Sequence, residues 1–389
     1  MKIVITADSY LPRLGGQEMG AFRLAKYLVK KGNQVRIITT EKHVLQGREP
    51  GALDVLRLPH TFGPVDRRTL RRILEREFIG ADVVHSRYCY RLAAFSAPLA
   101  RKIAQRFVVS LHGLGLLDNP QDSPLKRWSH LRYRRVSLSL ADAVIATSSE
   151  FARLASTYCD PSRIHVIPNG VDTDEFDASR TAPEVLRQKY RGHQVVLAVR
   201  RLVPKNGIHY LVQVAPRILV SCPAARFVIG GWGSQEEELK RMTHESGVAA
   251  HFDFVGAIPN AEVPGYLAVA DVVVFPSSME STSHACLEAM AMAKPVVASR
   301  LGGLAELLGD QGRGVLVDLF ESANSTYRAP GTLSEEAGKR LAEAISHLLL
   351  DPVSARKIGG AAREHALAHF DWNVLVGRIL EVYGGGPSG

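Results

Sequence analysis

Cysteine is scarce in this sequence, and its four cysteines are far apart. Cys89, Cys159, Cys222 and Cys286 show neither a CxxC pair nor the Cys/His spacing of a structural zinc site. A disulfide framework is typical of short secreted chains that are dense in cysteine, which this chain is not. We therefore expect four reduced thiols, most of them buried.

Long apolar runs are also missing. The first apolar segment, residues 3–7, stops at Asp8, so it is too short for a secretory signal and far below the ~20 residues of a membrane span. We expect a cytoplasmic protein. No segment is low in complexity, and 46% of the 389 residues are hydrophobic. Because a single core stops growing at about 250–300 residues, we expect two domains of similar size.

Basic residues outnumber acidic residues in one half of the chain only. Residues 1–180 contain 28 Lys and Arg against 18 Asp and Glu, so the whole net charge of +9 comes from this half. The excess is concentrated in three segments, at 67–77, 98–106 and 124–135. It indicates either an anionic partner for the first half or a solvated basic surface.

Two series of short apolar runs alternate with helical patterns. The expected strands of the first series are 2–7, 34–39, 81–86, 107–113, 142–148 and 163–170. Those of the second series are 194–200, 226–231, 251–256, 271–277, 294–300 and 313–318. Continuous apolar strands between amphipathic helices are typical of parallel sheets covered on both faces. The sequence therefore predicts an α/β protein with two Rossmann-like domains.

The polar and acidic segment 172–183 interrupts the alternation and fits an interdomain linker. We place the first domain at 1–172 and the second at 173–370. The tail 371–383 has helical apolar spacing, and we expect it to pack back on the first domain.

The most specific motif lies at the end of an expected strand of the second domain. Glu280 ends a strand–loop segment, and Glu288 follows inside a helix that begins near Ser283. Open α/β sheets bind ligands at the carboxyl ends of their strands, and the first turn of the helix exposes amide N–H groups. Two carboxylates at this spacing suit a ligand with two separate polyols, although both could also be ordinary surface charges.

The residues around this pair resemble a known family. The pattern E-x7-E, then E-A-M-A-x-x-x-P-V-V-A-S and G-G-x-x-E, over 280–306, is similar to family 4 of the glycosyltransferases with the GT-B fold. The resemblance extends over nearly the whole chain. It implies two Rossmann-like domains that face a central cleft, and retaining transfer of a hexose-type sugar from a nucleotide-diphosphate sugar.

The resemblance also implies roles for the residues of the motif. Glu280 would bind the transferred sugar and Glu288 the ribose hydroxyls, with Thr282, Ser283 and His284 near the sugar and phosphates. The usual family form has Gly-Phe-Gly between the two glutamates, whereas this chain has Ser-Thr-Ser-His at 281–284. The donor sugar is left open by this difference.

A cationic turn, VRRLVPKNG at 199–207, follows the first strand of the second domain. A nucleoside diphosphate that leaves as an anion needs fixed positive charge, which Arg and Lys at such a turn supply. The family has Arg and Lys five residues apart. Arg201 and Lys205 are our preferred diphosphate ligands, with Arg200, five residues before Lys205, as the alternative. We expect no metal and no other cofactor beside the nucleotide-sugar.

Two positions of the first domain complete the expected site. Gly15 and Gly16 lie in a turn between the first strand and the first helix, where the backbone can approach a ligand. His112 ends another strand, and the resemblance places it beside the reacting sugar carbon as a neutral imidazole. Asn169-Gly170 matches the interdomain crossover of the family, and we interpret it as structural.

The basic segments predict a lipid-linked or anionic acceptor, and a possible peripheral site on the inner face of a membrane. Trp128 and Tyr133 lie among these charges and suit a membrane interface. Two alternatives stay open: a nucleotide-sugar epimerase of the same fold, and a non-catalytic protein that binds nucleotide-sugars or lipids. Nucleic acid is not indicated, because no recognised nucleic-acid module is present.

Overall fold

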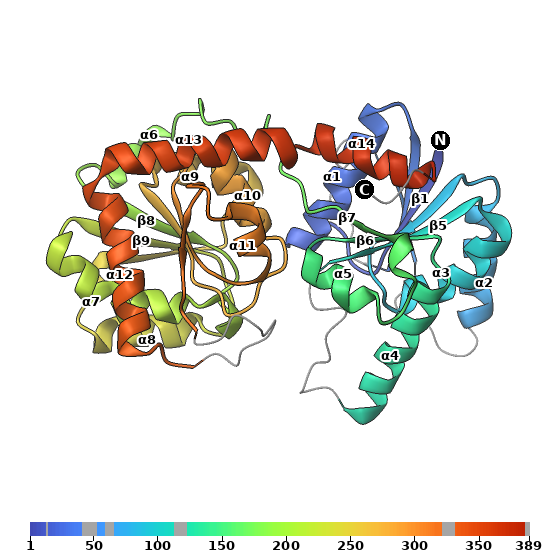
Figure 1. Ribbon diagram of the computed structural model, residues 1–389, viewed down its shortest axis with the longest axis horizontal. Coiled ribbons are helices and arrows are strands. Elements are labelled where there is room, and N and C mark those ends of the chain that lie inside the picture. The colour runs from blue at the N-terminus through green and yellow to red at the C-terminus, as the bar shows by residue number, and fades with distance from the viewer. Residues whose placement is uncertain (13–14, 41–52, 59–65, 113–122, 321–330, 386–389) are drawn as a thin grey trace. The chain divides into compact units, whose positions relative to one another are not determined.

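The computed structural model describes residues 1–12, 15–40, 53–58, 66–112, 123–320 and 331–385. The chain forms two compact units, shown in Figure 1. The first unit comprises Met1–Gly170 and Trp372–Gly389, and the second comprises Val171–Asp371. The chain thus leaves the first unit once and returns to it for the last helix.

The first unit is built on a seven-stranded parallel sheet in the order β3-β2-β1-β4-β5-β6-β7. Its elements are β1 (Lys2–Ala7), α1 (Gly16–Lys30), β2 (Gln34–Thr39), β3 (Asp54–Arg57), α2 (Asp66–Phe78), β4 (Val83–Ser86), α3 (Arg91–Ile103), β5 (Arg106–Leu111), α4 (Pro124–Ser139), β6 (Ala143–Ala146), α5 (Ser149–Ala155), β7 (Ile164–Val166) and α14 (Trp372–Tyr383).

Both faces of this sheet are buried because its strands are apolar at successive positions. Along β1, Ile3 and Ile5 face a core shared with α1 and α14, whereas Val4 faces a core shared with α2, α3 and α5. Figure 1 shows α14 beside α1, and Trp372 of α14 stacks on Tyr27 of α1 with 6.1 Å between the ring centroids. The last helix is therefore part of the first unit's core.

The second unit repeats this strand order in a six-stranded parallel sheet, β10-β9-β8-β11-β12-β13. Its elements are α6 (Glu184–Lys189), β8 (Gln194–Val199), α7 (Ile208–Ser221), β9 (Ala225–Gly230), α8 (Glu236–Glu245), β10 (Phe252–Gly256), α9 (Val263–Val269), β11 (Val272–Phe275), α10 (His284–Ala291), β12 (Val296–Ser299), α11 (Gly302–Leu308), β13 (Val315–Val317), α12 (Glu335–Leu350) and α13 (Pro352–His369). One core contains α7, α8 and α12, and the other contains α9, α10, α11 and α13.

Each of the twelve expected strands has a counterpart in the structure, and most of the observed strands are shorter than expected. The sequence analysis missed β3, an edge strand without buried side chains. The expected linker at 172–183 begins directly after the boundary between the units, at Gly170 and Val171, and it belongs to the second unit. Phe176 is fully buried in the core of the second unit, and the backbone oxygen of Asp172 accepts a hydrogen bond from the Phe176 amide. Because the rest of the segment is polar, its composition did not indicate that its single aromatic side chain is buried.

The order of strands reverses between β8 and β11 in the second unit, and ligands bind at such a reversal in open α/β sheets. Gly207 joins the turn after β8 to α7 with a φ of 73°. A Cβ atom at this position would lie 1.9 Å from the backbone oxygen of Pro276, which follows β11. The two chain segments at the reversal therefore approach as closely as backbones can, and only glycine permits it.

We predict that Gly207→Ala lowers the free energy of unfolding by about 3 kcal/mol, because the new methyl group clashes with a backbone oxygen that cannot turn away. Urea denaturation followed by circular dichroism measures the change. Gly192→Ala is the matched control, because Gly192 has a φ of 80° and a Cβ atom added there would have no atom within 4 Å. It should cost only about 1 kcal/mol of backbone strain. Equal losses in the two variants would contradict the close approach.

Candidate functional site

The turn after β8 places three cationic side chains at the strand reversal of the second unit. Arg200 and Arg201 directly follow β8, and Lys205 lies in a 3₁₀ turn at Pro204–Asn206. Their side chains differ in exposure: Arg201 is exposed, whereas Lys205 is half-buried and Arg200 is only 8% exposed. The turn itself is closed by the Asn206 side-chain amide, which donates to the Arg201 backbone oxygen at 2.7 Å.

Arg200 forms a buried ion pair with Glu280. Its Nη2 donates to Glu280 Oε2 and, at 3.2 Å, to Asn206 Oδ1. The Glu280 side chain is only 14% exposed, and the guanidinium lies 5.3 Å from the ring centroid of Phe275. The pair joins the segments that follow β8 and β11. Of the two arginines considered from the sequence, Arg200 is therefore the one that contacts Glu280.

Backbone contacts fix the loop that carries Glu280. The Ser278 amide donates to the Lys205 backbone oxygen at 2.9 Å, and the Gly303 amide at the start of α11 donates to the Glu280 backbone oxygen at 3.2 Å. A Cβ atom at Gly303 would lie 1.6 Å from the Ser281 oxygen, so α11 also touches this loop directly. The glutamate is thus held from both sides.

The electrostatics of the turn favour an added anion. Burial lowers the pKa of the Lys205 ammonium, Arg200 and Arg201 act in the same direction, and Glu280 opposes them. A bound diphosphate would supply the negative charge that such a partly buried ammonium group lacks. Glu280 balances only one of the three cations.

The helix α10 begins directly after the loop that carries Glu280. Ser283 caps the helix, with its hydroxyl accepting a hydrogen bond from the Cys286 amide at 3.3 Å. Thr282 and Ser283 are buried, whereas His284 and Glu288, both on the helix, are half-buried. The helix therefore begins at the predicted position.

The first unit carries the other predicted residues. Gly15 precedes α1 and Gly16 begins it, whereas Arg13 and Leu14 of the same glycine-rich turn lie outside the described residues. A Cβ atom at Gly15 would lie 2.4 Å from a carboxylate oxygen of Glu18. The Gln17 side-chain amide donates to the His112 backbone oxygen at 3.3 Å, so the glycine turn and the end of β5 lie together.

His112 is buried, with both ring nitrogens in side-chain hydrogen bonds. Nδ1 lies 3.1 Å from Asn169 Oδ1, and Nε2 lies 2.9 Å from Ser110 Oγ. Asn169, which we interpreted from the sequence as structural, is thus a direct partner of a candidate site residue. Gly170 next to it is structural, because a Cβ atom there would lie 2.9 Å from the Trp372 ring.

The sequence analysis missed two charged residues at the strand ends of the first unit. Burial raises the pKa of Asp8, directly after β1, to about 6. Arg87, directly after β4, is 2% exposed, and burial lowers its pKa. Their position in the sequence is the signal that could have found them. Asp8 and Arg87 each directly follow an apolar strand, as His112 does, and so lie at the sheet edge where ligands bind.

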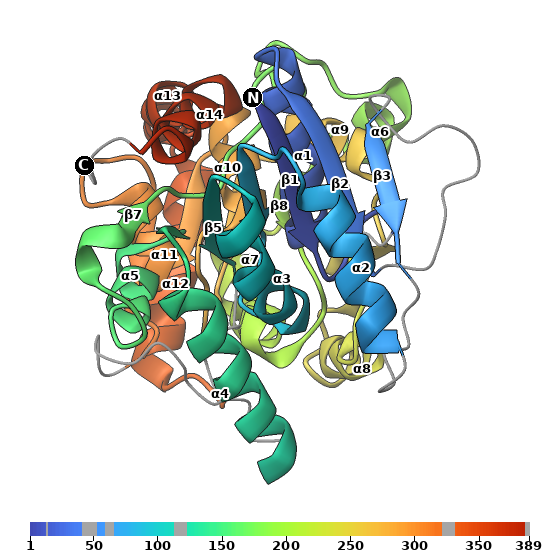
Figure 2. The same cartoon turned by 90° about the vertical axis from the view of Figure 1, so that its right-hand side faces the viewer.

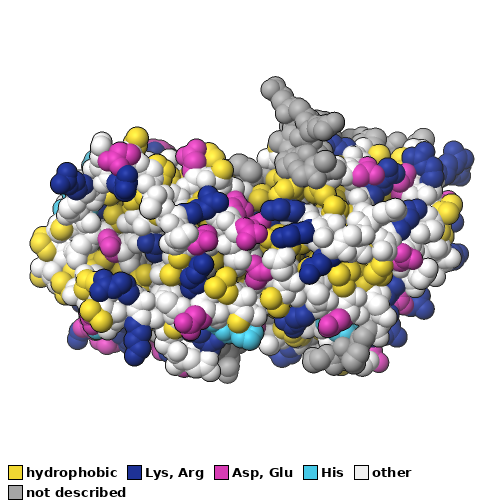
Figure 3. Space-filling model, turned by 90° about the horizontal axis from the view of Figure 1, so that it is seen from above, with side chains coloured by type: hydrophobic (Ala, Val, Ile, Leu, Met, Phe, Trp, Pro, Cys, Tyr) yellow, Lys and Arg dark blue, Asp and Glu magenta, His cyan; other side chains and the backbone are white. Residues whose placement is uncertain are grey.

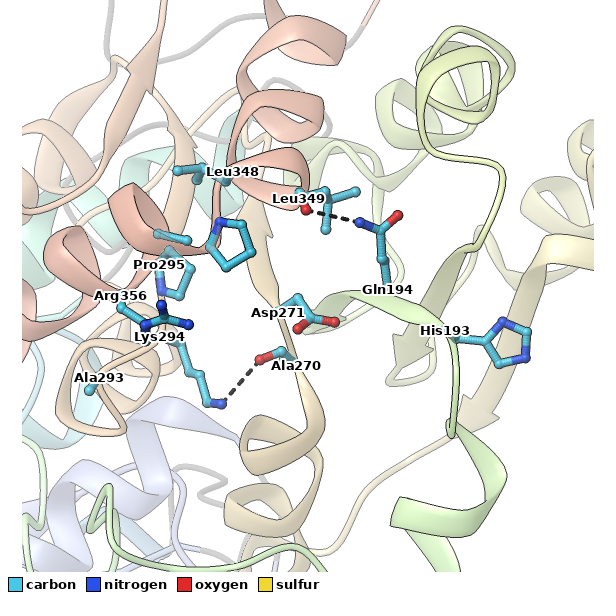
Figure 4. A pocket seen from close by; sticks show the side chains of 12 residues that line it. His193, Gln194, Ala270, Asp271, Ala293, Lys294, Pro295, Leu348, Leu349 and Arg356 are labelled. Atoms are coloured by element: carbon cyan, nitrogen blue, oxygen red, sulfur yellow. Dashed lines mark hydrogen bonds between the residues drawn. The ribbon is translucent and has the colours of Figure 1, made fainter.

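A hollow of about 320 Å³ lies at the opposite edge of the second sheet, where β8, β11 and β12 begin (Figure 4). Three of its polar side chains bind the protein's own backbone. Lys294 Nζ donates to the Ala268 and Ala270 oxygens at 2.9 and 3.1 Å, Asp271 accepts from the Val195 amide at 2.7 Å, and Gln194 donates to the Leu349 oxygen at 2.9 Å. These contacts stabilise the sheet edge, so the hollow is not our candidate site.

Comparison with known families decides the identity of the chain. The model of the Glycosyltransferase Family 4 matches residues 14–175, and that of the Glycosyl transferases group 1 matches residues 186–365. A GDP-mannose-dependent alpha-(1-6)-phosphatidylinositol monomannoside mannosyltransferase of Mycolicibacterium smegmatis is 32% identical over 307 residues, which cover 75% of this chain and 74% of that protein. The chain belongs to family 4 of the glycosyltransferases.

Other similar proteins support this assignment. An alpha-maltose-1-phosphate synthase of Mycolicibacterium smegmatis is 32% identical over 329 residues, 78% of this chain and 79% of that protein. The crystal structure of HepE from Anabaena, in complex with UDP and glucose, superposes with a TM-score of 0.77 at 20% identity and covers 99% of this chain and 100% of that one. The fold of this glycosyltransferase is accordingly GT-B.

Two features are absent from the described residues of this glycosyltransferase. No helix among them is both long and apolar enough to cross a membrane. Within the same part of the chain, no three His, Cys, Asp or Glu side chains gather as ligands of a metal ion would.

We predict that Arg200→Ala lowers the free energy of unfolding by about 3 kcal/mol, because it leaves the buried Glu280 carboxylate without its guanidinium partner. Chemical denaturation measures the loss. Arg201→Ala removes the neighbouring but exposed guanidinium and should change stability by less than about 0.5 kcal/mol. If the two variants are equally stable, the ion pair does not hold the site together.

Proposed function

We propose that this glycosyltransferase is a retaining hexosyltransferase that uses a nucleotide-diphosphate sugar, needs no metal, and acts on a lipid-linked or anionic acceptor. One observation carries the proposal: Arg200, Lys205 and Glu280 meet at the strand reversal of the second sheet. This arrangement provides cations for a diphosphate and a fixed carboxylate for a sugar.

In this proposal, the site residues of the second unit have three kinds of role. Arg201 and Lys205 bind the diphosphate, while Arg200 orients the Glu280 carboxylate, whose second oxygen can accept a hydrogen bond from the transferred sugar. Glu288 on α10 binds the ribose hydroxyls, and the amide groups at the start of α10 face the phosphates.

In the proposed reaction, the acceptor hydroxyl attacks the anomeric carbon from the face that the diphosphate leaves. The bond from the anomeric carbon to the phosphate oxygen breaks, and a bond to the acceptor oxygen forms on the same face. The acceptor proton passes to the departing phosphate oxygen, whose negative charge Arg201 and Lys205 stabilise. In the first unit, Gly15 and Gly16 allow the backbone to approach the ligand, and His112 lies beside the reacting sugar as a neutral imidazole.

The donor is a hexose nucleotide, with GDP-mannose as the first candidate because the mannosyltransferase relative uses it. UDP-glucose is the second candidate, since the HepE structures contain UDP and glucose. The segment 281–284 lies between the two glutamates and departs from the common Gly-Phe-Gly, so we assign sugar selectivity to it.

We predict that Lys205→Ala and Glu280→Gln each lower sugar transfer at least 100-fold, because each removes an interaction with the charge or hydroxyls of the reacting donor. Release of the nucleoside diphosphate from GDP-mannose and from UDP-glucose measures the reaction. Activity should persist with excess EDTA, since cationic side chains take the place of a metal at the diphosphate. Lys189→Ala, an exposed lysine of α6, is the control variant. Loss of activity with EDTA, restored by Mg²⁺, would contradict the metal-free reaction.

A buried cation in the first unit supports an anionic acceptor. Arg87 is 2% exposed, and its Nε and Nη2 atoms are buried without a hydrogen-bond partner among the described residues. Leaving a buried guanidinium without a partner is costly, so a bound anionic group would stabilise it. Because Arg87 follows β4, it lies at the ligand-binding edge of its sheet.

The helix α4 supports a membrane-bound acceptor. Figures 1 and 2 show its first turns extending from the first unit, where Leu125 and Trp128 are 75% and 58% exposed. The helix has five Lys and Arg residues and no Asp or Glu. It packs on α3, which packs on α2, so the three basic segments of the sequence cover one side of the sheet. On the face shown in Figure 3, by contrast, acidic and basic side chains are interspersed.

We predict that the protein sediments with phosphatidylglycerol vesicles at low salt and that Leu125→Ala/Trp128→Ala weakens this binding about tenfold or more, because two apolar side chains no longer enter the interface. The control is Val185→Ala/Val353→Ala, which alters two apolar side chains of the second unit that are at least as exposed. Wild-type protein that stays in the supernatant, or that binds neutral vesicles equally well, would contradict an anionic membrane partner.

A further inference from the structure

A continuous chain of buried side chains connects the last helix of the protein to His112. The Tyr383 hydroxyl of α14 lies 2.5 Å from His85 Nδ1, and His85 Nε2 lies 2.9 Å from Ser110 Oγ. Ser110 Oγ lies 2.9 Å from His112 Nε2, and His112 Nδ1 lies 3.1 Å from Asn169 Oδ1. All five residues belong to the first unit, and none of the five is more than 8% exposed.

The Asn169 acceptor and the neutral form of both histidines determine which group donates in each hydrogen bond of the chain. The Asn169 carbonyl oxygen can only accept, so His112 donates from Nδ1, and a neutral imidazole then has a lone pair at Nε2. Ser110 must therefore donate its hydroxyl proton to His112 Nε2 and accept one from His85 Nε2. A neutral His85 is then an acceptor at Nδ1, where the Tyr383 hydroxyl donates.

We propose that Tyr383, acting through His85 and Ser110, is a positioning residue that keeps His112 neutral and in the Nδ1–H tautomer. For its catalytic consequence this inference rests on the proposed function, in which His112 lies beside the reacting sugar. Because both ring nitrogens are bonded within the chain, the chain fixes the orientation of the His112 ring as well as its tautomer.

The surroundings of His85 favour the neutral form on which this direction depends. Burial lowers the pKa of His85 well below its usual value, and the neighbouring Arg87 cation acts in the same direction. Burial also raises the pKa of Tyr383, so its phenol keeps the proton that it donates. A proton added to His112 at Nε2 would force Ser110 and His85 to reverse their hydrogen bonds, and Tyr383 with them. Ser110, His85 and Tyr383 therefore oppose protonation of His112 at Nε2, and Asn169 opposes exchange to the tautomer without a proton at Nδ1.

Histidine ¹⁵N chemical shifts test the proposal without reference to activity. In full-length protein labelled at histidine, with the His112 signals assigned through a His112→Asn variant, we expect a protonated Nδ1 and an unprotonated Nε2. Tyr383→Phe removes only the hydroxyl at the far end of the chain, and it should convert His112 to a mixture of tautomers. Ser110→Ala cuts the chain in the middle and should have the same effect, which covers the case in which the Tyr383 variant folds poorly.

Kinetics then separate positioning from general damage. Tyr383→Phe should lower kcat roughly tenfold, as loss of a partner behind a functional histidine typically does, with a donor KM changed by less than about twofold. Tyr27→Phe is the matched control, because Tyr27 is also buried against α14 but is not a member of the chain. It should leave both the His112 shifts and kcat unchanged.

Three outcomes distinguish the possibilities. Wild-type His112 protonated at Nε2 would overturn the proposal, as would His112 shifts that stay the same in both Tyr383→Phe and Ser110→Ala. Shifts that change as expected in a protein without glycosyl transfer would support the positioning chain and overturn the proposed function alone.

Discussion

The buried ion pair between Arg200 and Glu280 is the contact on which the second unit's site depends. It joins the segments after β8 and β11, the two strands between which the sheet reverses its order. Both side chains lose most of their hydration, a cost that is recovered only while each keeps its partner. The close approach of Gly207 to the Pro276 oxygen, and the amide bonds from Ser278 and Gly303, give this pair a rigid frame. A ligand therefore meets a carboxylate that is already oriented.

The two units share one strand order, but different interactions dominate at their ligand-binding edges. The second unit gathers charge, with cations in excess of carboxylates at the turn after β8. The first unit also has charged groups at this edge, Asp8 and Arg87, but it holds the His112 ring in buried hydrogen bonds to Ser110 and Asn169. A site that binds a diphosphate requires an excess of positive charge, whereas an imidazole held in one tautomer requires fixed hydrogen-bond partners.

The return of the chain at Trp372 has a local role as well as a packing role. Apolar side chains of α14 complete a core of the first unit, and Tyr383 near the end of the helix contacts His85. Tyr383 is almost 300 residues from His85 in the sequence. It nevertheless contacts β4, the strand paired with β5, after which His112 follows. No local pattern in the sequence indicates such a contact.

The sequence by itself determined the α/β class, the twelve main strands and the motif that carries Glu280 and Glu288, because strand periodicity and turn composition are local properties. It did not show that the segment 172–183 packs on the second unit, because the composition of this segment is polar and only one side chain, Phe176, is buried in the core. Only the tertiary structure decided which arginine contacts Glu280, since Arg200 and Arg201 are neighbours in the sequence and differ in the direction of their side chains. It alone connected Tyr383, His85 and Ser110 to His112. Such contacts depend on three-dimensional distances between strands and helices that the linear sequence does not contain.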